Sequence, residues 1–102
     1  MLEIKRLSKK IKSEIHDAEE YARDALSCKE NDKATGDLYY ELAEEELGHM
    51  EKLHNRVVKM INTYKAEKGT PPPDMQAKYD YIHEEMIDAV KEVKILMAMY
   101  KG

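Results

Sequence analysis

Apolar residues recur every three or four positions along almost the whole chain, and only two short segments interrupt this period. In the first long segment they stand at Ile4, Leu7, Ile11, Ile15, Ala18, Ala22 and Ala25. Such spacing places apolar side chains on one face of an α-helix, whereas a half-buried strand needs strict alternation. The interruptions are CKENDK, residues 28–33, and GTPPP, residues 69–73. The pattern predicts three helices, over about residues 2–30, 32–68 and 74–101.

The residues at the two interruptions are typical of helix ends. Asn31 and Asp32 carry short polar side chains that compete with helical hydrogen bonds and can cap the following helix. Gly69 is a common C-terminal cap, because glycine adopts a left-handed backbone without steric penalty. The prolines at 71–73 cannot continue a helix, so we expect Asp74 to cap the third helix.

The second predicted helix is too long and too broadly apolar to be covered by a single neighbour. At 1.5 Å per residue it spans about 50 Å. Its apolar arc covers roughly 150° of a helical wheel and comprises Tyr39, Leu42, Leu47, Met50, Leu53, Val57 and Ile61. Residues 94–100 are apolar nearly all round and would form an unusually large exposed patch. We therefore expect one all-α domain that completes its bundle as a homodimer or higher oligomer.

Charge and cysteine content exclude several classes of protein. The net charge of −4 opposes general nucleic-acid binding, which needs a basic surface to displace counterions. Cys28 is the only cysteine, so no intrachain disulfide can form, and a lone thiol suits the cytoplasm. No apolar run approaches the roughly 20 residues that cross a bilayer, and the N-terminal segment lacks the apolar stretch of a secretory signal. The expected protein is soluble and cytoplasmic, without nucleic-acid or membrane partners.

Three polar residues occupy positions where packing would favour apolar side chains. Glu46 lies near the middle of the second helix's apolar arc, and His49 lies about 60° away at its edge. Glu14 interrupts the stripe of the first helix. If the chain folds back near residue 30, Glu14 and Glu46 are equidistant from the turn, and Ala18 leaves room beside them. A buried carboxylate costs several kcal/mol unless it is paired, and a metal ion is one such partner.

The spacing of these residues matches half of a known metal-binding arrangement. Glu46 and His49 are three residues apart and share one helical face. Di-iron carboxylate bundles combine one Glu from each of two helices with Glu-x-x-His from each of the other two. A two-fold homodimer of this chain would supply the full set. The residues therefore predict two metal ions per dimer, held by Glu14, Glu46 and His49; iron or manganese suits these donors, and zinc also accepts them.

The run YYELAEEELGHM, residues 39–50, resembles the second helix of ferritin-like proteins, especially rubrerythrins and the small encapsulated ferritins. The similarity covers about residues 10–65 and implies that Glu14, Glu46 and His49 are iron ligands. It also implies a ferritin-like antiparallel hairpin that dimerises around a di-iron ferroxidase site, with a third long helix added. This chain departs from rubrerythrins in lacking a second Glu-x-x-His on an apolar stripe and rubredoxin-like cysteine pairs.

Other polar residues compete for a place at this site. Glu51 and His54 repeat the Glu-x-x-His pattern, but Glu51 falls on the polar side, so we interpret this copy as chance. Glu19 is the rival to Glu14 on the first helix, although it lies beyond the apolar arc. His16 is expected on the charged face. Packing or interface roles are expected for the remaining His83, Tyr21 and Tyr39.

The predicted activity is ferroxidase-like, the oxidation of iron(II) by oxygen or peroxide. Excess negative charge would draw cations to the site, and the metal ions would carry the redox step. Two alternatives remain open at the level of the sequence. One is a non-enzymatic helical oligomer that acts as a structural or interaction protein, and the other is a structural metal site without turnover.

Overall fold

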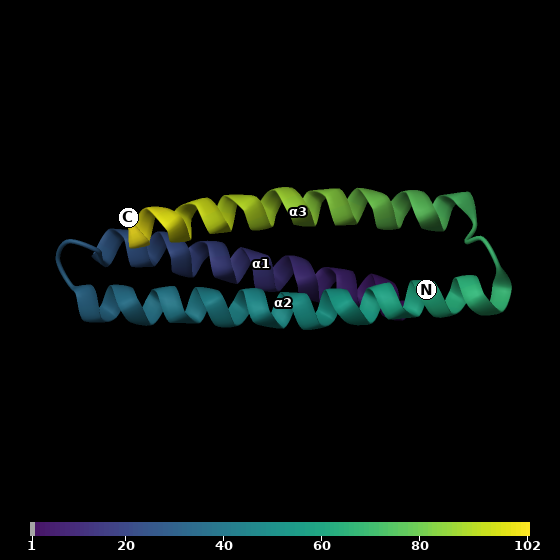
Figure 1. The fold of residues 1–102 in the computed structure, drawn as a ribbon, viewed down its shortest axis with the longest axis horizontal. Coiled ribbons are helices and arrows are strands. Elements are labelled where there is room, and N and C mark those ends of the chain that lie inside the picture. The colour runs from purple at the N-terminus through teal and green to yellow at the C-terminus, as the bar shows by residue number, and fades with distance from the viewer. Residues whose placement is uncertain (1) are drawn as a thin grey trace.

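Three long helices run side by side, each antiparallel to the next along the chain, in the computed structural model, which describes residues 2–102 apart from the side chain of Lys78 (Figure 1). They form a rod of 56 × 18 × 17 Å. The described residues contain no strand. The predicted all-α fold is confirmed, and the boundaries agree within about two residues, with helices α1 (Leu2–Cys28), α2 (Lys33–Lys68) and α3 (Pro73–Lys101).

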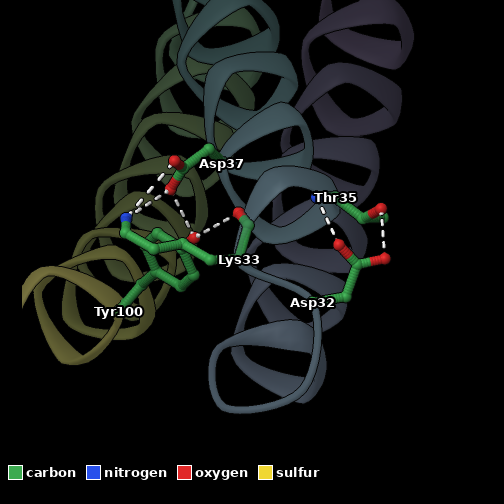
Figure 2. A network of polar contacts seen from close by, with 5 residues as sticks. All are labelled: Asp32, Lys33, Thr35, Asp37 and Tyr100. Atoms are coloured by element: carbon green, nitrogen blue, oxygen red, sulfur yellow. Dashed lines mark hydrogen bonds and ion pairs between the residues drawn. The ribbon is translucent and has the colours of Figure 1, made fainter.

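Both ends of α2 are capped as the sequence predicts. Oδ1 of Asp32 accepts a hydrogen bond from the Thr35 backbone N–H at 3.1 Å, and Oδ2 accepts one from the Thr35 hydroxyl at 2.6 Å (Figure 2). These bonds lower the pKa of Asp32. Gly69 ends α2 with φ at 84°, and its N–H donates to the Lys65 carbonyl. The sharp reversal at each end follows from these local bonds.

The start of α3 differs from the prediction that Asp74 caps this helix. The N-cap is Pro72, Pro73 occupies the first turn, and no side chain caps the end. Proline is well suited to this position, because its missing N–H would have no helical partner and its fixed φ is already helical. The last proline of the run therefore begins the helix, and Asp74 lies within the first turn.

Helix α1 packs against both other helices, whereas the backbones of α2 and α3 come close at very few points. Small residues make this arrangement feasible: Ala18, Ala22 and Ala25 on α1 are almost fully buried. The helices α2 and α3 meet instead through large side chains. Tyr40 stacks on Tyr100 with ring centroids 5.5 Å apart, and His54 stacks on His83 at 5.2 Å.

A polar contact fastens the end of α3 to the start of α2 (Figure 2). The Tyr100 hydroxyl donates to Oδ1 of Asp37 at 2.6 Å. This bond is the main cause that lowers the pKa of Asp37 and raises the pKa of Tyr100 to about 12. Nearby, Nζ of Lys29 donates to the Met99 carbonyl at 2.9 Å.

The apolar tail of α3 is only partly covered within the chain. Leu96, Met97 and Tyr100 are buried, whereas Ile95 and Met99 remain 56% exposed. Part of the predicted exposed patch is therefore core of the single chain. No described helix is long and apolar enough to cross a bilayer.

Gly36→Ala tests the close contact between Gly36 and the side chain of Tyr100. An added Cβ would lie 2.7 Å from the Tyr100 hydroxyl and 3.3 Å from the Ala25 carbonyl oxygen. We expect the substitution to lower the free energy of unfolding by about 1–3 kcal/mol in urea titrations followed by circular dichroism, although alanine is the better helix former. In a Tyr100→Phe background the penalty should shrink. An equal penalty in both backgrounds would show that the hydroxyl does not limit this space.

Candidate metal centre

The structure brings Glu14, Glu46 and His49 together at the middle of the α1–α2 contact. Nδ1 of His49 lies 3.4 Å from Oε2 of Glu14 and 3.8 Å from Oε2 of Glu46. One potential ligand atom from each residue falls within 4.8 Å of the others. The level placement expected from the fold-back near residue 30 is confirmed, since α1 and α2 run antiparallel on either side of that turn (Figure 1).

The two carboxylates are largely covered, while the imidazole faces outward. The side chains of Glu14 and Glu46 are 27% and 19% exposed, whereas that of His49 is 55% exposed. Oε2 of Glu14 is inaccessible to solvent and accepts no hydrogen bond from the described residues, although Nδ1 of His49 lies 3.4 Å away. A buried carboxylate oxygen without a partner is unfavourable, so this atom marks a place where a further donor or cation would be stabilising.

The electrostatics of the pair show an excess of negative charge. The pKa of Glu46 is raised to about 7, chiefly by a hydrogen bond with Glu14 and then by burial and repulsion from the Glu14 charge. The charge of His49 lowers the pKa of Glu46, and the charge of Asp17 raises it further. Among the described residues, no Lys or Arg forms an ion pair with either carboxylate. Near neutral pH the site therefore retains a proton that a cation would displace.

The donor set fits a transition metal. Two carboxylates and one imidazole are ligands that iron, manganese and zinc all accept. Three side chains from one chain are fewer than the donors of an iron-carboxylate bundle, which come from four helices. The arrangement can hold a cation, and its exposed edge at His49 is where further ligands would enter.

Two tyrosines lie on the same side of this centre. Tyr21 follows Glu14 by two turns of α1, and Tyr39 precedes Glu46 by two turns of α2, so both lie toward the turn between the helices. Their rings stack with centroids 6.2 Å apart. Both are half-buried, which agrees with the predicted packing role. We call the surface formed by Glu14, Tyr21, Tyr39, Glu46 and His49 the α1–α2 seam.

The rival residues lie elsewhere. Glu19 pairs with Arg23 at 2.9 Å and lines a groove between α1 and α3, so it lies outside the cluster of Glu14, Glu46 and His49. Glu51 is exposed and stands apart from the cluster, as expected for a chance copy of the motif. Its companion His54 stacks on His83, and burial is the main cause that lowers the pKa of His54.

Sequence reasoning missed two features near the polar residues. Asp17 is half-buried one turn beyond Glu14, and its charge raises the pKa of Glu46. The signal for Asp17 is its i,i+3 spacing from Glu14. The stacking of His54 on His83 was also missed, because no local pattern reports which residues of two distant helices stand level.

Comparison with known proteins gives no relative from which a role could be transferred. No family model, curated protein or solved structure matches the chain. The interpretation of the cluster therefore depends on its own geometry and electrostatics.

The raised pKa of Glu46 predicts a pH-dependent stability of the metal-free protein. A carboxyl whose pKa rises from 4.5 to about 7 on folding contributes stability that is present below pH 4.5 and is lost as the pH rises through 7. Glu46→Gln removes this titration. The melting temperature of the natural chain, relative to the variant, should therefore fall between about pH 5 and 7 in the presence of a chelator.

The comparison with the variant is necessary because His54 acts in the opposite direction. Its lowered pKa gives stability that is lost as the pH falls below 6.5. This contribution is common to both proteins and cancels in the difference. A difference in melting temperature that is independent of pH would show that Glu46 does not hold a proton in the folded chain.

Proposed function

We propose that two copies of this chain bind iron at the α1–α2 seam and oxidise iron(II). The observation that supports this proposal most strongly is the meeting of Glu14, Glu46 and His49, where a buried carboxylate oxygen of Glu14 accepts no hydrogen bond from the described residues. The two carboxylates repel each other when both are ionised, and among the described residues no lysine or arginine forms an ion pair with either of them. A divalent cation is the simplest group that would stabilise this pair.

A second copy would supply the missing ligands. One chain offers half of the donors found in a di-iron carboxylate bundle, and His49 presents the more exposed edge of the cluster. A two-fold axis beside the seam would set the same three residues of a partner against these. The resemblance of residues 39–50 to ferritin-like proteins supports the same arrangement, in which each subunit contributes one Glu and one Glu-x-x-His.

The side chains of the site have distinct roles in this proposal. Glu14 and Glu46 supply anionic oxygens, and His49 supplies an imidazole nitrogen. The proton that Glu46 retains near pH 7 would leave when a cation binds, so uptake would be accompanied by proton release. Iron held by these side chains would supply the redox chemistry, with oxygen or peroxide as the electron acceptor. Packing between α1 and α2 leaves the Glu14 and Glu46 side chains only 27% and 19% exposed, which restricts their movement.

Oxidation of added iron(II) tests the proposal. Iron(II) is added anaerobically to the purified protein, air is admitted, and the near-ultraviolet absorbance of the ferric product is followed. The natural chain should oxidise about two irons per dimer. Glu46→Ala should oxidise iron no faster than buffer, because it removes one carboxylate from each half of the site.

Glu51→Ala is the matched control, since Glu51 belongs to the second Glu-x-x-His of the same helix but is exposed and outside the cluster. It should behave as the natural chain does. Equal loss in both variants would point to a non-specific effect of acidic charge. Binding without oxidation would favour a structural metal, and no binding at all would leave a helical interaction protein.

A further inference from the structure

A groove of about 610 Å³ runs between α2 and α3. It lies on a different side of α2 from the α1–α2 seam. The residues that line this α2–α3 groove are Tyr40, Glu44, Leu47, Gly48, Met50, Glu51, Val90, Lys94, Met97 and Ala98. The groove exists because α1 holds α2 and α3 on either side of itself, so that their backbones stay apart. Its inner surface is largely apolar, and its rims are charged.

The two rims carry opposite charge. Glu44 and Glu51 stand on the α2 rim, whereas Lys94 stands on the α3 rim. All three side chains are exposed, and none forms an ion pair with a described residue. The aromatic stacking between α2 and α3 fixes the alignment of these antiparallel helices. By this alignment Glu44 and Lys94 are level with each other on opposite rims.

Gly48 on the α2 rim gives a second, independent observation. A glycine inside a helix costs roughly 1 kcal/mol relative to alanine. At Gly36 a close neighbour explains the glycine, but a Cβ added at Gly48 would meet nothing within 4 Å. No described residue of the same chain therefore explains why position 48 has a glycine. A glycine lining an open apolar groove is suited to close approach by another backbone.

We propose that a second copy of this chain docks its own α2–α3 groove onto this one, around a two-fold axis parallel to the helices. Such an axis preserves the level of each residue and sets α2 of one copy over α3 of the other. Glu44 then faces Lys94 of the partner subunit, and the reverse contact is identical. The four facing helices are all antiparallel to their neighbours, as in a four-helix bundle.

The charges select this axis over the other one that face-to-face packing allows. A two-fold axis perpendicular to the helices would set α2 over α2 and α3 over α3. The acidic rims would then meet each other, and like charges in close contact are unfavourable.

Reciprocal charge reversal tests this docking in solution. Lys94→Glu makes both rims acidic, and Glu44→Lys makes the α2 rim less acidic and sets lysine against lysine. Each variant alone should show a lower mass than the natural chain in sedimentation velocity. An equimolar mixture of the two should regain the mass of the natural chain, because opposite charges can then meet across the contact. An effect confined to one chain cannot be rescued by mixing.

Lys9→Glu is the control, because Lys9 is exposed on α1 and lies outside the groove. It changes the net charge as Lys94→Glu does and should keep the natural mass. The docking proposal would be overturned if both single variants kept the mass of the natural chain, or if their mixture stayed dissociated. It would also be overturned if the natural chain were strictly monomeric.

Iron binding separates this inference from the proposed function. The Lys94→Glu variant leaves the α1–α2 seam unchanged, so its iron uptake per chain should equal that of the natural chain. If mixing the variants restores the mass but the protein binds no iron, the docking proposal is supported and the proposed metal site is wrong. If the protein binds iron but its mass does not respond to charge reversal, the metal site is supported and the docking proposal is wrong.

Discussion

The close contact between α1 and α2 sets the positions of the polar cluster and of the third helix. Ala18 and Ala43 are both fully buried in the core cluster, and their small side chains let the two helices approach. The longer side chains of Glu14 and Glu46 are consequently brought together, whereas on separate helices each carboxylate would be hydrated. Apolar packing thus holds together two carboxyl groups that repel each other when both are ionised. The retained proton on Glu46 and the buried oxygen of Glu14 are consequences of that packing.

The same packing keeps the backbones of α2 and α3 apart. Because α1 lies against both other helices, α2 and α3 touch mainly through rings such as Tyr40 and Tyr100. A rod of 56 × 18 × 17 Å has much surface for its volume, and among the described large side chains only Val93 is completely buried. Small domains of this kind bury a limited share of their apolar surface alone. The α2–α3 groove, with Leu47, Met50 and Val90 in its lining, is one apolar surface that a single chain leaves without a neighbouring helix.

Much of the candidate site could be predicted because it follows from two simple rules. Helical periodicity placed Glu46 and Glu14 on apolar faces, and equal distance from one turn placed them level. Those rules do not report how much space surrounds a side chain. They could not show that His49 is more than half exposed, that Asp17 contributes to the electrostatics, or that His54 lies against a second imidazole. These features depend on the rotation and separation of helices, which are settled by packing between residues distant in sequence.

The three helices and most of their ends follow directly from the sequence, because caps and periodicity are local properties of the chain. Asp32 and Gly69 act through bonds to residues three or four positions away, so their effect can be predicted without knowing the fold. Which helix faces meet and which stay open depends on contacts between residues that are distant in the sequence. The placement of α1 against both neighbours depends on the summed packing of many side chains, and the charged α2–α3 groove exists solely as a result of it.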